Sequence, residues 1–178
     1  MPTSQKDALM ELQGRLAEKL QAVRVVSSPT GWLAVECAGQ ALLLPLSDAG
    51  EIFPVSTILP VPYTRRWFLG VTNLRGVLVG VVDLGAFLGL RDGRGGSTRD
   101  QARIIALSAG LEVNAALLVD RLAGLRNPAQ LTLVAENLPG QPAFASAQYQ
   151  DESGRIWQEL RLSLLCRDEQ FLQILDRA

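Results

Sequence analysis

The sequence contains no histidine, and this absence excludes several kinds of active site. Without an imidazole the chain cannot form a Ser-His-Asp or Cys-His nucleophile, bind a metal through histidine or carry a phosphohistidine. Cysteine is nearly absent as well, because Cys37 and Cys166 are the only two and cannot form a cysteine-only zinc site or a disulfide framework. We therefore expect a protein without metal or other cofactor that is not an enzyme.

Strong charge and long apolar runs are also lacking. The 17 Lys and Arg residues nearly balance the 18 Asp and Glu residues, so the net charge of −1 provides no basic field for nucleic acid or an anionic membrane. The richest apolar stretch, Val77 to Val82, ends at Asp83 and is far shorter than the roughly 18 residues of a membrane span. The N-terminus is charged throughout and does not resemble a signal peptide. We therefore expect a cytoplasmic protein with reduced thiols that neither enters a membrane nor binds nucleic acid.

Residues 1–24 predict an amphipathic helix, and residues 25–31 predict a linker. Ser4 can cap the helix, and apolar side chains recur on one face at three- and four-residue spacings: Leu9, Leu12, Leu16, Leu20 and Val23. The linker contains the turn-forming run Ser27-Ser28-Pro29-Thr30-Gly31. The helix either packs on its own domain or docks on another molecule.

Beyond the linker, residues 32–178 follow a pattern of short β-strands. Strands are expected at 32–37, 41–46, 52–55, 77–84, 103–107, 113–120, 122–126, 144–149 and 156–162. Helical character is expected at 84–90 and 163–175. The polar, glycine-rich segment 91–101 predicts a mobile loop, and it has neither the lysine nor the following helix of a phosphate-binding loop.

A weak internal duplication organises this pattern. An Ala38-Gly39 turn separates two apolar strands in the first half, and Ala109-Gly110 is placed in the same way in the second. Farther along the chain, each hairpin is followed by a strand that continues into a short helix. A glycine precedes this strand in both halves, Gly76 in the first and Gly154 in the second. Such a pattern predicts paired small β-barrels that share one hydrophobic core. The two halves would span about 32–90 and 103–175, and the loop 91–101 would join them.

Two carboxylates are the strongest candidates for chemistry. Asp83 and Asp120 each end an apolar strand and could form an acid–base pair. Structural roles explain them better, because Asp83 precedes a helix that it can cap and Asp120 can hold a turn or a local ion pair. Cys37 lies in an apolar strand and is expected to be a buried side chain rather than a reactive thiolate. A carboxylate-dependent enzyme that uses Asp83 and Asp120 stays an alternative.

The most distinctive segment is 67–76, Trp-Phe-Leu-Gly-Val-Thr-Asn-Leu-Arg-Gly. Two aromatic residues lead into a glycine-bounded loop that carries Asn73 and Arg75. Gly76 suits a positive φ, and Asn73 can hold a turn by hydrogen bonding to the backbone. The five-donor guanidinium of Arg75 suits a carboxylate or the peptide carbonyls of a partner. The alternative is a solvated arginine on a structural turn.

The same segment resembles the signature of the CheW-like adaptor family. Gly70-Val-Thr-Asn-Leu-Arg-Gly76 is similar to the family's Gly-(Val/Ile)-x-Asn-(Leu/Val)-Arg-Gly and continues into a strand that ends in Asp83-Leu84. Ile58–Pro62 and Leu117–Leu122 resemble further family segments, and the likeness extends over about 32–175. It implies a mainly β fold of two SH3-like five-stranded β-barrels that share a hydrophobic core, with an N-terminal amphipathic helix and a C-terminal helix.

The resemblance also implies a function without catalysis. Adaptors of this family couple the cytoplasmic tip of a methyl-accepting chemoreceptor to the regulatory domain of a CheA-type histidine kinase, which implies recruitment to membrane receptor arrays at the cell pole. Carried over by position, the implied partner-binding residues are Val71, Asn73, Leu74 and Arg75. The implied supports of the loop are Gly70, Gly76 and Asp83. No catalytic residue or metal ligand is implied.

Three features depart from the family pattern or refine it. Arg161 stands in the second half where Asp83 stands in the first, and the N-terminal helix is longer than a minimal adaptor needs. Trp157 and the closing segment 171–175 are similar to adaptors of the type IV pilus branch. We therefore expect an adaptor of twitching motility, with flagellar chemotaxis coupling as the alternative.

Overall fold

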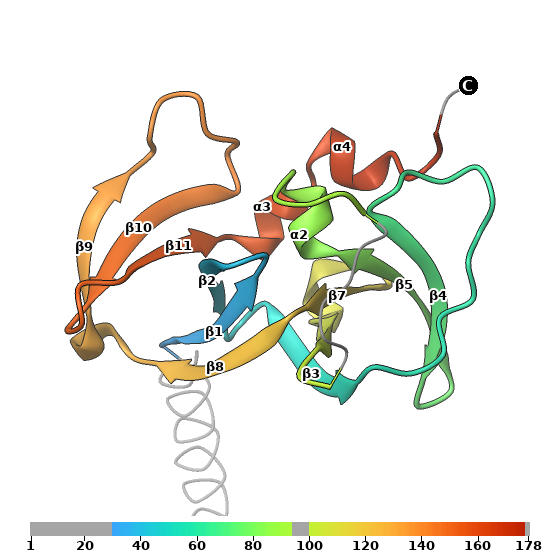
Figure 1. Cartoon of the computed structure of the whole chain (residues 1–178), viewed down its shortest axis with the longest axis horizontal. Coiled ribbons are helices and arrows are strands. Elements are labelled where there is room, and N and C mark those ends of the chain that lie inside the picture. The colour runs from blue at the N-terminus through green and yellow to red at the C-terminus, as the bar shows by residue number, and fades with distance from the viewer. Residues whose placement is uncertain (1–29, 94–99, 177–178) are drawn as a thin grey trace, which may run out of the picture. The chain divides into compact units, whose positions relative to one another are not determined.

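The structure is a computed structural model that describes residues 30–93 and 100–176 (Figure 1). The helix predicted at 1–24, almost all of the linker predicted at 25–31 and residues 94–99 of the predicted loop lie outside the described residues. Contacts between residues group Gly31–Ala178 into one structural unit.

Two β-sheets form this unit, in agreement with the mainly β prediction. The first sheet has six strands in the order β8 (Arg121–Arg126), β1 (Trp32–Cys37), β2 (Gln40–Pro45), β11 (Ile156–Leu160), β10 (Ala145–Asp151) and β9 (Leu131–Glu136). The second has five in the order β3 (Ala49–Pro54), β6 (Arg103–Leu107), β7 (Ala115–Val119), β5 (Val77–Asp83) and β4 (Phe68–Leu74). Neighbouring strands are antiparallel, except that β11 lies parallel to β2 and β5 parallel to β7.

The two strand orders repeat each other. In each sheet a hairpin (β1–β2 or β6–β7) is followed by a parallel strand (β11 or β5) and its antiparallel partner (β10 or β4), and β9 is the extra strand of the first sheet. The predicted duplication is therefore confirmed. The outer strands are exchanged, however, because β3 follows β2 but pairs with β6, and β8 follows β7 but pairs with β1. Each sheet thus contains strands from both predicted halves, 32–90 and 103–175, and neither half builds a sheet alone.

Short helical turns lie between some of the strands and after the last one. The turn α2 (Leu84–Phe87) follows β5, α3 (Leu162–Leu165) follows β11, α4 (Glu169–Leu172) comes last, and the 3-10 turns are η1 (Ala109–Leu111) and η2 (Pro128–Gln130). The helical character predicted at 163–175 is divided between α3 and α4. Asp168 separates them, because its side chain caps α4 by accepting hydrogen bonds from the backbone N–H groups of Gln170 and Phe171 at 2.9 and 3.2 Å.

The main hydrophobic core is built from both sheets. Fully buried Val35 and Leu42 from the first sheet belong to the same cluster as fully buried Ile105 and Leu117 from the second. The prediction of one shared core is therefore confirmed. Cys37 also lies in this core, and burial raises the pKa of its thiol to about 12. It is the buried, unreactive side chain that the sequence predicts.

Candidate functional site

The signature segment 70–76 forms the end of a tight β-hairpin. Strands β4 and β5 pair along their length, and only Arg75 and Gly76 connect them. Both residues have positive φ, 50° and 87°, as a two-residue turn of type I′ requires. The side-chain Oδ1 of Asn73 accepts a hydrogen bond from the backbone N–H of Gly76 at 2.7 Å. The predicted roles of Gly76 and Asn73 in the turn are confirmed, but the predicted loop is a strand followed by a two-residue turn.

Gly70 is required by a close approach of two backbone segments. Its φ is 134°, and a Cβ atom at this position would overlap the carbonyl group of Leu59. Leu59 and Val71 exchange two backbone hydrogen bonds of 2.8 and 2.9 Å, which fix part of the β3–β4 connection at the outer edge of β4. Gly70 thus holds the structural position that a supporting role requires.

The four residues implied as partner contacts lie in different environments. Asn73 is exposed, and 75% of the Arg75 side chain is accessible. Val71 is half-buried. Leu74, in contrast, is only 7% exposed and packs with Val79 in a second hydrophobic cluster. The Leu74 side chain therefore lies in the core and anchors the hairpin, and a partner contact at this position stays a prediction.

Arg75 reaches back over β3. Its guanidinium pairs with Glu51 at 2.5 Å and lies 5.9 Å from the centroid of the Phe53 ring. An exposed ion pair of this kind stabilises a fold by about 0–1 kcal/mol, so a carboxylate of a partner could replace Glu51 with little loss. The turn therefore presents a guanidinium whose local partner is weak.

A groove of about 350 Å³ lies beside the hairpin between β3, β5 and η1, and its lining includes Phe53, Val113 and Arg75. Val77, the first residue of β5, also lines it and is 53% exposed. The next residue, Leu78, is 61% exposed but does not line the groove. Sequence reasoning missed Val77 and Leu78, because β5 reads as one uniformly apolar strand, and it did not single out Phe53 of β3. The position of Val77 and Leu78 directly after the hairpin turn could have indicated their exposure, because strand residues next to such a turn extend beyond the core.

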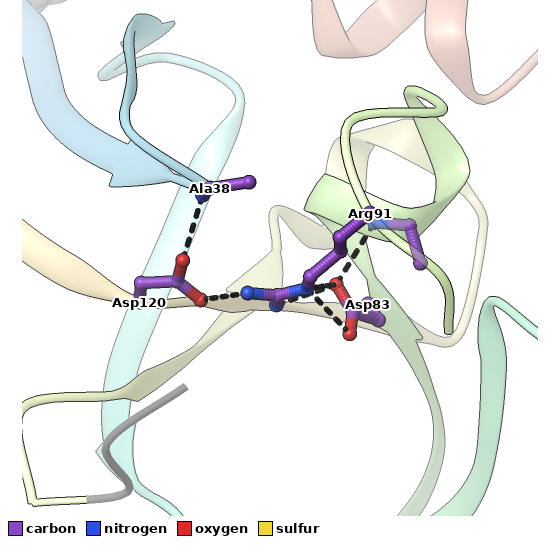
Figure 2. A network of polar contacts seen from close by, with 5 residues as sticks. Ala38, Asp83, Arg91 and Asp120 are labelled. Carbon is purple, nitrogen blue, oxygen red and sulfur yellow. Dashed lines mark hydrogen bonds and ion pairs between the residues drawn. The ribbon is translucent and has the colours of Figure 1, made fainter. Parts of the chain in front are cut away.

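The side chain of Arg91 joins two carboxylates across the two sheets (Figure 2). Its guanidinium donates hydrogen bonds to Asp83 at 2.7 Å and to Asp120 at 2.6 Å. Asp120 also accepts from the backbone N–H of Ala38, in the β1–β2 turn, at 2.7 Å. Asp83 also accepts from the backbone N–H of Ala86 at 3.0 Å and thereby caps α2. Asp83 ends β5 of the second sheet, and Ala38 lies in the turn between two strands of the first, so the network connects the two sheets. We call it the Arg91 clamp.

The clamp corrects two predictions and confirms one. The sequence places Arg91 in a mobile loop, but only 13% of its side chain is exposed, so the prediction is wrong at this residue. Burial opposes the charge of Arg91, yet its hydrogen bonds to Asp83 and Asp120 raise the pKa of the guanidinium above its usual value. The capping role predicted for Asp83 is confirmed. The ion pair of Asp120 is not the local one that the sequence predicts, because its partner is Arg91, 29 residues earlier, whereas the neighbouring Arg121 pairs with Glu36.

The same network leaves no free acid–base pair. One guanidinium neutralises both carboxylates, and each also accepts a backbone N–H, whereas a general acid or base exchanges its proton with a substrate. The geometry therefore gives no support to a carboxylate-dependent enzyme. Across residues 30–93 and 100–176, no three His, Cys, Asp or Glu side chains group so that they could hold a metal ion. Within those ranges no helix is long and apolar enough to cross a membrane.

Arg161 occupies the position in the second half that corresponds to Asp83. Its φ and ψ of −75° and 103° nearly equal the −71° and 103° of Asp83, and each residue precedes a helical turn. Arg161 is exposed, and its side chain makes no capping hydrogen bond to α3. The duplication has therefore kept the backbone conformation here but not the chemistry.

Comparisons with known proteins agree with the signature. The profile of the CheW-like domain matches residues 31–170. The chain is 28% identical to the protein PilI of Pseudomonas aeruginosa over 113 residues, which cover 64% of this chain and 61% of that protein. It is 31% identical to the chemotaxis protein CheW of Thermotoga maritima over 108 residues, which cover 58% of this chain and 68% of that protein. The match to PilI thus spans less than two thirds of that relative.

The fold has a counterpart among solved structures. The crystal structure of the scaffolding protein TtCheW from Thermoanaerobacter tengcongensis superposes with a TM-score of 0.60 at 23% identity, over 75% of this chain and 89% of that chain. The predicted fold of two SH3-like β-barrels is therefore confirmed. Because the profile match covers residues 31–170, the chain belongs to the CheW-like domain family, whose scaffold proteins are non-enzymatic adaptors of chemotaxis-type signalling.

Proposed function

We propose that this protein is a non-enzymatic adaptor that joins the cytoplasmic tip of a methyl-accepting chemoreceptor to the regulatory domain of a CheA-type histidine kinase. The observation that carries the proposal is the signature hairpin, which holds Arg75 exposed at the edge of an apolar groove. Arginine beside a pocket that a partner can desolvate is typical of the residues that dominate binding energy at protein interfaces. Such a surface suits a partner protein better than a small substrate.

The docking surface consists of exposed side chains around the turn. We assign it to Asn73, Arg75, Val77 and Leu78, together with the groove that Phe53 lines. Half-buried Val71 contributes at most its outer side.

Four further residues give this surface its shape. Gly70 and Gly76 allow the backbone conformation, Leu74 anchors the hairpin in the core, and Asp83 holds the far end of β5 in the Arg91 clamp.

Reversal of the turn charge tests the proposal. In Arg75→Glu the new carboxylate lies beside Glu51 and the cation is lost, so we expect binding to the kinase regulatory domain, to a receptor-tip fragment or to both to weaken at least about tenfold. Surface plasmon resonance with each purified partner measures this. Arg161→Glu is the matched control, because Arg161 is also exposed but lies after β11, and it should bind as the wild type does. Wild-type affinity of Arg75→Glu for both partners would remove the hairpin from the interface.

Of the two pathways, we propose the type IV pilus pathway, with recruitment to receptor arrays at the cell pole. The similarity to PilI supports this choice, and flagellar chemotaxis is the second candidate because of the similarity to a chemotaxis protein CheW. Deletion of the gene distinguishes the two. Loss of twitching on agar with normal swimming supports the pilus pathway, and the reverse supports flagellar chemotaxis. A fluorescent fusion shows whether the protein gathers at the pole.

A further inference from the structure

We propose that a second docking surface, built on the β3–β4 connection, takes a partner segment that carries both acidic and apolar side chains. We call it the Tyr63 surface. Its exposed apolar members are Leu59, Val61 and Tyr63 on the connection and Leu175, which pairs with Thr64. Its charged members are Arg65 and Arg66. The surface is distinct from the hairpin turn, and the proposal does not depend on the adaptor function.

The backbone of this surface is held in place at both ends. At one end, Leu59 exchanges two backbone hydrogen bonds with Val71 of β4. At the other end, the backbone N–H of Arg65 donates to the carbonyl of Ile174 at 2.8 Å. The N–H of Asp176 donates to the carbonyl of Tyr63 at 2.9 Å. In Figure 1 the connection from β3 to β4 runs along the margin of the second sheet and meets the C-terminal segment. A partner would therefore meet a preorganised surface and would not have to order it on binding.

Tyr63 is the feature that points to binding. Its φ is 57°, a conformation that is strained for a bulky side chain, and 85% of the residue is exposed. The fold thus holds an aromatic ring in water at an energetic cost and without burial to compensate for it. Backbone strain of this kind gathers at functional positions, and tyrosine is enriched among the residues that dominate protein interfaces.

A groove of about 430 Å³ adjoins the ring. Its walls include Pro60, Pro62 and Phe68 together with the two arginines. The prolines fix the local backbone, because their rings restrict φ. Leu175 lies close by, since it pairs with Thr64 in an isolated β-bridge. An apolar side chain of a partner could therefore be enclosed between the groove and the C-terminal segment.

The charge of the groove identifies the rest of the partner. Among the described residues that line it, Arg65 and Arg66 are the charged ones, and none is acidic. Within residues 30–93 and 100–176 no carboxylate forms a salt bridge with either arginine, so both guanidinium groups can pair with a partner. Two guanidinium groups beside an apolar groove are complementary to carboxylates that flank an apolar residue.

Fluorescence anisotropy with the full chain tests the proposal. The probes are two fluorescein-labelled synthetic peptides with identical leucine and phenylalanine positions, one with glutamate and the other with lysine at every remaining position. We expect the glutamate peptide to bind at least about tenfold more tightly than the lysine peptide. The double variant Arg65→Glu/Arg66→Glu should lose at least about tenfold in affinity for it. Tyr63→Asn should lose affinity as well, and its fold is preserved because asparagine tolerates a positive φ.

Arg161→Glu serves as the control for a change of net charge and should bind the glutamate peptide as the wild type does. Thermal denaturation of every variant separates a loss of binding from a loss of fold. Equal binding of the two peptides, no binding of the glutamate peptide, or wild-type binding by both variants would overturn the proposal. So would sedimentation showing a dimer that Tyr63→Asn disrupts, because the surface would then be covered by a second copy of this chain.

Discussion

Arg91→Ala removes the guanidinium of the clamp and leaves two carboxylates facing each other. The side chains of Asp83 and Asp120 are only 8% and 22% exposed, so water cannot fully replace the lost partner. The clamp also joins the end of β5 to the β1–β2 turn through Asp120 and Ala38. The substitution therefore affects the contact between the two sheets as well as a local ion pair.

The loss of stability can be worked out from this geometry. Removal of one partner of a buried ion pair costs about 3–5 kcal/mol, because the remaining charge stays buried without compensation. In this case backbone N–H groups still donate to both carboxylates, and Asp120 has some access to water, which puts the expected loss at the lower end, about 3 kcal/mol. For a domain of this size such a loss lowers Tm by about 6–12 °C.

Urea unfolding followed by tryptophan fluorescence measures the loss, because Trp32, Trp67 and Trp157 all lie in the described domain. Arg161→Ala is the matched control and should change stability by no more than about 0.5 kcal/mol, since its side chain is exposed and caps nothing.

Addition of Asp83→Asn to Arg91→Ala should recover part of the loss, because one buried charge disappears while an oxygen that caps α2 remains. If Arg91→Ala alone costs less than about 1 kcal/mol, the network behaves as a surface ion pair and the reasoning is wrong.

Three further predictions test other parts of the fold. Gly70→Ala should lower the urea midpoint strongly, because its Cβ atom would overlap a backbone carbonyl; the same change at Gly76, where nothing lies within 4 Å, should cost less, and equal losses would contradict the close approach. Hydrogen bonds from the Ser153 hydroxyl and the Trp157 indole N–H lower the pKa of Asp151 from 3.8 to about 2. The stability that the ionised carboxylate adds to the fold is therefore fully present above pH 3.8 and is lost as the pH falls to about 2. Asp151→Asn should remove that part of the pH dependence of unfolding, and an unchanged acid profile would refute the assignment. Glu159→Leu leaves the Trp32 indole and the Ser146 hydroxyl without their acceptor and should cost about 2–4 kcal/mol by urea unfolding, whereas Glu159→Gln should cost clearly less.

The sequence predicts best those features that depend on neighbouring residues. The hairpin turn at Ala38-Gly39, strand β6 at Arg103–Leu107 and the cap at Asp83 each follow from a local pattern. The duplication is also visible, and Arg161 corresponds in it to Asp83. The two halves keep the same backbone conformation at this position although the residue types differ. A repeated pattern of strands and turns therefore predicts the architecture even where the two halves share few identical residues.

The features that were missed depend on residues far apart in the chain. Strand β4 contains Gly70 and Asn73, which favour loops locally, and it is a strand because it pairs with β5 on one side and with Leu59 on the other. Strand β9 shows no alternation, since four of its six residues are exposed. Arg91 begins a polar, glycine-rich run, and only the folded chain brings it to Asp120, 29 residues later.

The signature strand also connects the Arg91 clamp to the turn that we propose as a docking site. Strand β5 begins beside Arg75 and Gly76 and ends at Asp83, so one continuous strand of seven residues links the exposed turn to the Arg91 clamp. A docking surface binds with less loss of entropy when its support is rigid. Strand β5 provides such support, because it pairs with β4 along its length, pairs with β7 over 80–83 and is clamped at its end. Because the clamp also reaches the β1–β2 turn of the other sheet, the hairpin is positioned by both sheets rather than by its own alone.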